Sequence, residues 1–461
     1  MRKKIKNEDK MNEKDKQEEQ IVNEKKKEKK SKKEKKKKSS DRTRMLKWLK
    51  FIIVLCIIVI VLEIAFMLIK WWQNENNTVY IDTISTVKPI EDGYIGVGSS
   101  DFKYSRYVDY QKEYAKAKLT KYNSNKEVVF ETAYTDGYSS TFNDVLETED
   151  YYIAVGCVQN DEQQIEDNAT DGLLVVYDKT GNIVDEKTLQ IAGDTNLIKI
   201  KAIDDGYLVA GQSILQNMVL GNDPNGGGIL IKYDKDFNEV WRVNYGGSKS
   251  GIFNDFIVDG DAIYVVGKDA TRYGIFVKYD LDGNRQFVKN YEYTDLVGFS
   301  AIDKIGDDYV VVGGKTDNID ASDADKTTSA LLVKYDADGN VIYEKTYSLN
   351  GNERYNELLV DDDTIVAVGH TYVKDEEEST DMYNVFRYSG IFARYDSDGN
   401  EIKIEEEKGS RDTYFSDVFL TDHGYMVVGQ TSSTELGGNN KDLKGYFLEY
   451  DKNGKILSYY S

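Results

Sequence analysis

The chain has 461 residues and a formal net charge of −21, and this charge is unevenly divided. Residues 1–45 carry 20 Lys and Arg against 10 Asp and Glu, whereas residues 71–461 have a net charge of −33. The chain contains only two cysteines and two histidines. These numbers argue against a disulfide framework, a zinc site and a Cys/His catalytic pair.

Residues 1–45 form a tail rich in Lys and Glu, with runs such as KKKEKKSKKEKKKK. Such a segment buries too little apolar surface to offset its chain entropy, so we expect disorder or a solvated helix. Its lysines are expected to lie on anionic lipid, at about 1 kcal/mol per basic residue. Nucleic-acid binding is the alternative, but no aromatic residues interleave with the lysines to stack on bases. We therefore expect no nucleic-acid partner.

A single transmembrane signal-anchor helix is predicted at residues 46–72. The segment Phe51–Ile69 is apolar except for Glu63, and as a helix it would span about 28 Å, close to the hydrocarbon thickness of a bilayer. Three of the four tryptophans flank it, where amphipathic rings settle at the headgroups. Glu63 indicates either a contact with a partner helix or a neutral glutamic acid tolerated by the span.

Two alternatives to an uncleaved anchor are weaker. The apolar run is longer than the roughly 7–15 residues of a secretory signal and has no small-x-small cleavage site. The sequence IVLC, which ends at Cys56, lacks the small residues of a lipobox. The basic excess before the span predicts a single-pass protein of the cell membrane with a cytoplasmic N-terminus, a linker at residues 73–77 and an extracellular C-terminal domain.

Residues 78–461 contain a pattern that recurs seven times. Its best-marked element is a short apolar strand that ends in glycine, as in GYLVAG and DYVVVG. The terminal glycines are Gly98, Gly156, Gly211, Gly267, Gly313, Gly369 and Gly429. A preceding segment in several repeats reads FNDV, FNDF, YNEL or FSDV. A later strand ends in Tyr followed by Asp or Asn, as in LLVKYD, and leads into a tight turn such as DADGN and a further strand.

Four short strands per repeat, β-branched and aromatic enrichment, no amphipathic helix and only two prolines predict an all-β fold. Seven such repeats predict a seven-bladed β-propeller of four-stranded antiparallel blades. A closed ring also removes exposed sheet edges. The segment at residues 79–84, VYIDTI, precedes the first full repeat, and we expect it to pair with the last blade, whose final strand ILSYYS is short.

The unit GYLVAGQS followed by GGILIKYDKDFNEVWRVNYGG resembles the repeat of bacterial extracytoplasmic β-propeller proteins, similar in style to quinoprotein-like and WD40-like propellers. The resemblance covers residues 78–461 and implies the fold. It implies no catalytic residue, because such repeats occur on many surface proteins of unknown role. The chain departs from the quinoprotein pattern, since the outer-strand tryptophan occurs only as Trp241 and nothing indicates a quinone site.

The DxDGN turns resemble the start of a calcium loop, in which alternate carboxylates reach one cation. No residue supplies the bidentate glutamate of the twelfth loop position; after Asp336, that position is Tyr347. We therefore interpret them as hairpin turns and expect no cofactor, with Ca²⁺ as the alternative. The candidate calcium ligands are Asp280, Asp282, Asp336, Asp338, Asp396 and Asp398.

Catalysis has little support in the sequence. A serine hydrolase with a histidine base would have to use His370 or His423, and no GxSxG stands beside either. An envelope enzyme, a hydrolase or lyase of glycans or peptides that uses acidic residues in the propeller channel, stays the alternative function.

Long connections between the second and third strands of the blades are expected on one face, opposite the short DxDGN turns. Binding usually resides in such loops on a rigid scaffold. We therefore predict a binding or scaffold module, with a protein or cell-envelope partner on the long-loop face. The acidic residues expected there are Asp317, Asp320, Asp323, Asp375, Glu376, Glu377, Glu378 and Asp381.

Overall fold

The computed structural model divides the chain into two compact units, residues 1–77 and 78–461, and each is described by itself. The described residues are 2–76, 78–105, 111–161, 169–191, 194–214, 227–246, 251–269, 273–291, 296–317, 327–375, 386–440 and 442–460.

The first unit is one helix, α1 (Arg2–Asn76). Residues 1–45, for which the sequence predicts disorder or a solvated helix, belong to it from Arg2 onward. Lys and Glu are good helix formers, and pairs one turn apart, such as Glu28 and Lys32 at 2.7 Å, support the helix. Within Lys27–Ile69, α1 has a stretch long and apolar enough to cross a membrane, and none of that stretch is buried.

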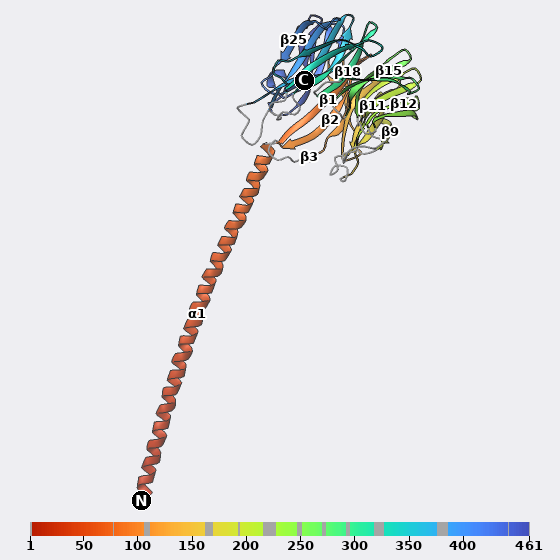
Figure 1. Cartoon of the computed structure of the whole chain (residues 1–461). Coiled ribbons are helices and arrows are strands. Elements are labelled where there is room, and N and C mark those ends of the chain that lie inside the picture. The colour runs from red at the N-terminus through yellow and green to blue at the C-terminus, as the bar shows by residue number, and fades with distance from the viewer. Residues whose placement is uncertain are drawn as a thin grey trace. The chain divides into compact units, whose positions relative to one another are not determined.

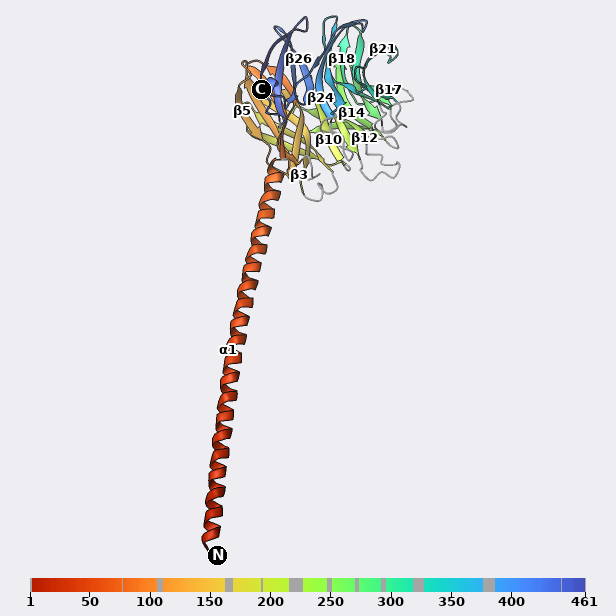
Figure 2. The same cartoon turned by 90° about the vertical axis from the view of Figure 1, so that its left-hand side faces the viewer.

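The second unit is a seven-bladed propeller of antiparallel sheets, as the repeat predicts (Figures 1 and 2). Blade 1 also contains the short strand β3 (Gln111–Glu113), which pairs with β2, and a 3₁₀ turn, η1 (Thr434–Leu436), lies in blade 7. From the inner to the outer strand, blades 1 to 4 are β1 (Thr78–Ile90), β2 (Gly93–Ser105), β4 (Lys116–Asn123) and β5 (Val128–Ala133); β6 (Ser139–Glu147), β7 (Tyr151–Gln159), β8 (Asp171–Asp178) and β9 (Ile183–Leu189); β10 (Asp194–Ile203), β11 (Gly206–Ile214), β12 (Gly227–Asp234) and β13 (Glu239–Gly246); and β14 (Gly251–Asp259), β15 (Ala262–Asp269), β16 (Gly274–Asp280) and β17 (Arg285–Tyr291).

Blades 5 to 7 repeat this order. They are β18 (Leu296–Ile305), β19 (Asp308–Asp317), β20 (Thr327–Tyr335) and β21 (Val341–Tyr347); β22 (Glu353–Asp361), β23 (Thr364–Lys374), β24 (Phe386–Asp396) and β25 (Glu401–Glu407); and β26 (Thr413–Thr421), β27 (Gly424–Thr431), β28 (Lys444–Asp451) and β29 (Ile456–Tyr460).

The apolar runs of the repeat form the middle strands, which are buried on both faces because each blade packs between two others. Strand β12, for example, is buried from Gly227 to Tyr233, whereas the outer strand β9 is mostly exposed. The hydrophobic core consists of seven clusters, and each joins two neighbouring blades, including blade 7 to blade 1. The ring is therefore held by burial at every junction.

Closure of the ring differs from the sequence prediction. Residues 79–84 are part of β1, the inner strand of blade 1, which pairs with β2 from Thr78 to Ile90. The expected pairing of this segment with the last blade is limited to one bridge, because the segment pairs with β2 and blade 7 already has four strands of its own. One parallel bridge, Ile81 to Leu443, joins β1 to blade 7, and the Asp82 amide donates to the Leu443 carbonyl at 3.0 Å.

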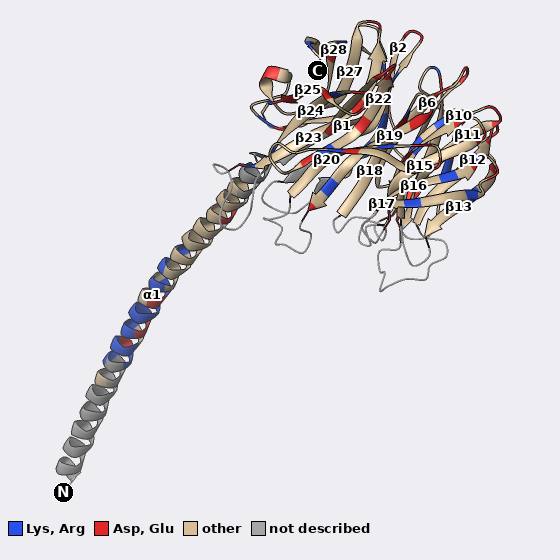
Figure 3. Ribbon diagram, turned by 45° about the horizontal axis from the view of Figure 1, so that its top comes forward, with Lys and Arg blue, Asp and Glu red and all other residues tan. Residues whose placement is uncertain are grey.

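The alternating strand directions give the propeller two distinct ends. The turn face carries the first-to-second and third-to-fourth strand turns, such as residues 204–205 and 280–284. At the opposite end, the long-loop face, the second strands end and the third strands begin, as at Asp317 and Thr327 in blade 5. Figure 3 shows Asp and Glu residues, coloured red on the ribbon, along the tight turns. The turn face thus carries acidic residues, as the DxDGN turns of the sequence imply.

Candidate functional site

All seven inner strands contain a β-bulge at the same point, where one extra residue interrupts the pairing with the second strand. A bulge bends its strand and redirects the extra side chain, and here six of the seven extra residues are polar. The bulge residues are Ser85, Asn143, Ile198, Asn254, Ser300, Asn356 and Ser416.

The repeat glycine stands opposite this bulge. In blade 5, a Cβ at Gly313 would lie 2.0 Å from the carbonyl oxygen of Gly298, and the equivalent distances across the seven blades are 1.8–2.2 Å. No side chain can occupy that space, because contacts of carbon with a carbonyl oxygen in sheets are about 3.3–3.6 Å. The glycine that ends each apolar strand is therefore required by the close approach of the inner strand.

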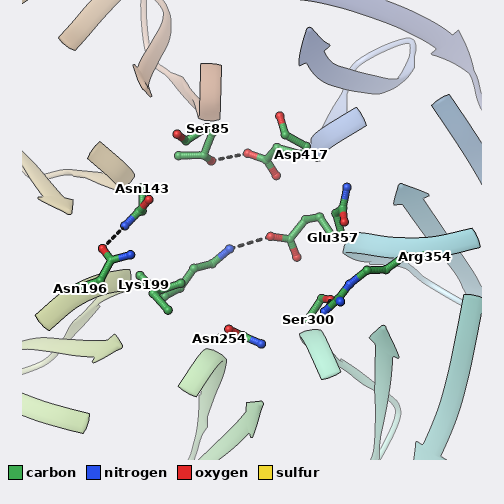
Figure 4. A pocket seen from close by; sticks show the side chains of 13 residues that line it. Ser85, Asn143, Asn196, Lys199, Asn254, Ser300, Arg354, Glu357 and Asp417 are labelled. Atoms are coloured by element: carbon green, nitrogen blue, oxygen red, sulfur yellow. Dashed lines mark hydrogen bonds and ion pairs between the residues drawn. The ribbon is translucent and has the colours of Figure 1, made fainter. Parts of the chain in front are cut away.

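The bulges surround a cavity of about 450 Å³ in the central channel, to which every inner strand contributes (Figure 4). All of its lining residues except Ile198 are polar or charged. The volume lies within the range of about 300–1,000 Å³ that is usual for small-molecule sites.

The bulge residues also connect neighbouring blades. The Nδ2 of Asn143 donates to the carbonyl of Leu197 at 2.7 Å, and the Nδ2 of Asn254 donates to that of Phe299 at 2.6 Å. Ser416 donates to the Ile84 carbonyl at 3.1 Å, so the junction of blade 7 with blade 1 uses the same device. Equivalent bonds run from Ser85 to Phe142 and from Asn356 to Phe415.

Carboxylates that follow the bulges make a second set of links. Asp144 accepts the amide of Ile200 at 3.0 Å, and Asp417 accepts the amide of Val87 at 3.2 Å and the hydroxyl of Thr86. Lys88 lies 3.8 Å from both carboxylates. Burial alone would lower the pKa of Lys88, but Asp417 and Asp144 raise it, so the ammonium stays charged.

An ion pair crosses the centre of the channel. Lys199 of blade 3 lies 2.6 Å from Glu357 of blade 6, and the two side chains point toward one another in Figure 4. Although burial opposes the charge of Lys199, Glu357 and Asp255 hold its pKa well above the ordinary value. Asp255 in turn lies 3.3 Å from Lys201 and accepts the amide of Ile302 at 3.0 Å. The channel carboxylates are therefore occupied by cations and backbone amides.

The candidate calcium ligands lie in turns in which the first aspartate accepts hydrogen bonds from groups of the same turn. The Oδ1 of Asp336 accepts the amides of Asp338 at 3.0 Å and Asn340 at 2.8 Å, and its Oδ2 accepts the Asn340 side-chain amide at 2.8 Å. These bonds, the side-chain one first, lower the pKa of Asp336. The same arrangement holds at Asp280 with Asp282 and at Asp396 with Asp398.

These contacts support the hairpin interpretation of the DxDGN turns. In the part of the chain that the structure describes, no group of three or more His, Cys, Asp or Glu side chains is placed to hold a metal ion. Calcium binding at these turns stays a prediction.

Only two of the eight acidic residues predicted on the long-loop face, Asp317 and Asp375, belong to the described residues. Asp317 ends β19 opposite Thr327. Asp375 follows β23 and accepts a hydrogen bond from the Arg387 Nε at 2.7 Å, so its charge is neutralised locally. The remaining candidates, Asp320, Asp323, Glu376, Glu377, Glu378 and Asp381, lie outside the described residues.

His370, a candidate base in the sequence, lies on β23 beside the channel mouth. Its Nδ1 lies 3.1 Å from the Asn356 Nδ2, and its ring packs against Tyr388 and Tyr414, with centroid distances of 5.9 and 6.1 Å. Burial, with the charge of Arg354, lowers the pKa of His370 to about 4. No serine hydroxyl among the described residues is hydrogen-bonded to it, so the geometry does not form a catalytic pair.

Sequence reasoning missed the channel residues although their signal was visible. The motifs FNDV, FNDF, YNEL and FSDV marked the inner strands. The structure shows that the second letter of each is the bulge residue facing the channel and the third is a carboxylate, which in Asp144, Asp255 and Asp417 bonds the next blade.

Comparisons with known proteins identify neither a family nor a function for the chain. No family model matches the chain, and no curated protein matches it. Among solved structures, the chain is similar to Sqt1 from Chaetomium thermophilum, at 13% identity and a TM-score of 0.44 over 82% of this chain and 85% of that one. It is similar to the WD40 β-propeller domain of Doa1, at 9% identity and 0.45 over 82% and 98%. It is also similar to a lignostilbene dioxygenase from Pseudomonas brassicacearum, at 10% identity and 0.45 over 81% and 90%.

Proposed function

We propose that this chain is a single-pass membrane protein whose propeller acts outside the cell as a binding or scaffold module of the cell envelope. A ligand or protein partner would be received at the channel mouth on the long-loop face. The observation that carries this proposal is the convergence of polar side chains from all seven inner strands on one cavity. Sites held on rigid strands keep their geometry, which favours specific recognition.

The anchor rests on α1. Its apolar stretch is long enough to span a bilayer, and its basic excess lies on the N-terminal side, which favours retention of that side in the cytoplasm. The propeller then lies outside the cell, and the lysines before the span lie against anionic headgroups. With a net charge of −33 after the span, the propeller is unsuited to nucleic acid.

The channel geometry favours binding over hydrolysis. A glycoside hydrolase needs one carboxylate free to donate a proton and a second free to act as nucleophile or base. Here Asp144 and Asp417 flank Lys88, Asp255 pairs with Lys201, and Glu357 pairs with Lys199. Burial raises the pKa of Glu357 against the pull of Lys199, yet its oxygen is already bonded. We therefore place the envelope enzyme second.

Two matched tyrosines allow a test in intact cells. Tyr372 lies near the long-loop end of β23, and Tyr151 begins β7 at the turn face. A photo-crosslinking phenylalanine derivative at Tyr372 in the full chain should join an envelope component, and the same derivative at Tyr151 should not. Equal crosslinking from both positions, or crosslinking from Tyr151 alone, would contradict the assigned face.

Topology is tested separately. An epitope tag after residue 461 should be accessible on intact cells and removed by added protease, while a tag before residue 2 stays protected. The reverse pattern would overturn the extracellular role.

A further inference from the structure

Two cations lie together at the channel mouth: Arg354, which lines the cavity, and Lys268, which lies near it beside Gly298. Arg354 on β22 and Lys268 on β15 are both half-buried. The Arg354 Nη2 donates to the Ser300 hydroxyl at 3.2 Å. Within the described residues, neither side chain has a carboxylate within ion-pair distance, whereas Lys88 has two and Lys199 and Lys201 have one each. Because the domain contains so many carboxylates, two neighbouring cations without an ion-pair partner require an explanation.

Blade 5 provides the space in which these cations converge. A Cβ at Gly298 would lie 3.4 Å from the Arg354 Nη2 and 3.7 Å from the Lys268 Cδ, so both side chains lie beside this glycine. A Cβ at Gly314 would lie 3.3 Å from the Arg354 Cγ. Gly298 and Gly314 pair across β18 and β19, at positions where blades 2 and 3 carry side chains. The pair of glycines thus forms a notch that holds the two cations.

The electrostatics of this notch favour an anion. Burial, and then the charge of Arg354, lowers the pKa of Lys268, and burial lowers the pKa of Arg354. Burial therefore disfavours the charged form of both side chains, and an oxyanion between Arg354 and Lys268 would stabilise it. Guanidinium and ammonium groups are the donors that proteins use for carboxylates and phosphates.

The amides around the channel add hydrogen-bond acceptors. Asn254 and Asn356 direct their Nδ2 groups at carbonyls of the next blade, which fixes the orientation of each amide. The Oδ1 of each has no donor among the described residues. The Asn143 Nδ2 donates to the Asn196 Oδ1 at 2.6 Å, which leaves the Asn196 Nδ2 as a donor. Free amide oxygens need a partner with O–H or N–H groups.

From these two features we propose that the channel mouth binds a hydroxyl-bearing oxyanion, such as a sugar acid or a sugar phosphate. The oxyanion lies between Arg354 and Lys268, and the ligand hydroxyls donate to the Oδ1 atoms of Asn254 and Asn356. This assignment names the ligand class of the same cavity and so rests on the proposed binding function. The cavity of about 450 Å³ suits a ligand of this size.

The test uses the purified full chain in detergent and four defined probes: glucuronate, glucose 6-phosphate, glucose and inorganic phosphate. We expect calorimetry to detect glucuronate or glucose 6-phosphate with at least tenfold higher affinity than glucose and inorganic phosphate. Which of the two charged sugars binds more tightly distinguishes a carboxylate from a phosphate ligand. Binding of none of the probes, or of glucose as tightly as the charged sugars, would overturn the oxyanion site. Equal binding of inorganic phosphate would overturn the role of the hydroxyls.

Three variants locate the site. Arg354→Gln and Lys268→Gln should each lower the affinity for the charged sugar at least tenfold. Arg242→Gln is the matched control, because Arg242 lies on the outer strand β13 with one ion pair, to Glu239 at 3.7 Å; it should bind as the parent does. Gly314→Ala keeps every charge but displaces the Arg354 side chain, so it should weaken binding while the melting temperature stays unchanged. Unaltered affinity in Arg354→Gln and Lys268→Gln would refute the proposal.

This outcome is separable from the broader function. If no probe binds but the derivative at Tyr372 still crosslinks an envelope component, the oxyanion site fails and the binding module stands. If both fail, the binding function fails with it.

Discussion

Gly313→Ala should unfold the propeller at a much lower urea concentration than Gly314→Ala, although both substitutions add one methyl group to neighbouring residues of β19. The methyl at position 313 would lie 2.0 Å from the Gly298 carbonyl oxygen, 2.9 Å from the Phe299 Cα and 3.0 Å from the Gly298 carbonyl carbon. All three atoms belong to the backbone. At position 314, the nearest atom is the Arg354 Cγ at 3.3 Å, part of a flexible side chain.

The expected loss of stability follows from the overlap between the added methyl group and the backbone of the inner strand. Carbon and carbonyl oxygen approach to about 3.3 Å in sheets, so a methyl group at position 313 requires a displacement of about 1.3 Å. The inner strand cannot yield without disturbing its bulge at Ser300. Overpacking costs about 1–3 kcal/mol and sometimes more, and we expect about 3 kcal/mol for Gly313→Ala. Gly314→Ala needs a shift of a few tenths of an ångström and should change stability by less than about 1 kcal/mol.

The measurement is pulse proteolysis of the detergent-solubilised full chain across a urea series, which reports the folded fraction of the propeller. A difference of about 2 kcal/mol or more between the two variants is the expected result, since overpacking against backbone is the costlier case. Equal stabilities would show that the inner strand yields freely, and the account of the repeat glycine would be refuted.

Three further predictions use the same assay. Ile198→Asn should stabilise the propeller by about 1 kcal/mol, because an amide at this bulge can donate to the carbonyl of Phe253 as those of other blades do; a loss of stability would show that blade 3 cannot accept the bond. Glu357→Gln should destabilise by about 3 kcal/mol, because Lys199 is left without its cross-channel partner, and the double replacement of both residues by Met should recover part of the loss; no recovery would contradict the assigned pairing. The pKa of His370 is about 4 in the folded chain and about 6.5 in an unfolded one. Between these pH values the unfolded state therefore binds more protons than the folded state. As the pH drops from 7 to 4, the free energy of unfolding should fall by at most about 3 kcal/mol. His370→Gln should flatten this decline, and parallel pH curves for parent and variant would disprove the contribution.

The repeat in the sequence was sufficient to predict the architecture. The seven glycine-terminated strands, the Tyr-Asp strand ends and the DxDGN turns identify four strands per unit and seven units, and the structure confirms the seven blades. These signals are local, because a strand or turn depends on the backbone preferences of a few neighbouring residues. The signal for the apolar stretch of α1 is also local, because the hydrophobicity of one segment is enough to identify a helix able to cross a membrane.

The proposed binding site could be found only from the tertiary structure. Asn254 and Asn356 are ordinary polar residues in sequence, and only the ring of bulges brings them to one cavity. The notch at Gly298 depends on Arg354 from blade 6 and Lys268 from blade 4, which no local pattern connects. The assignment of residues 79–84 to the inner strand likewise depends on which strand of the ring they meet. Each of these features is a meeting of distant segments, set by packing between blades rather than by the preference of any one segment.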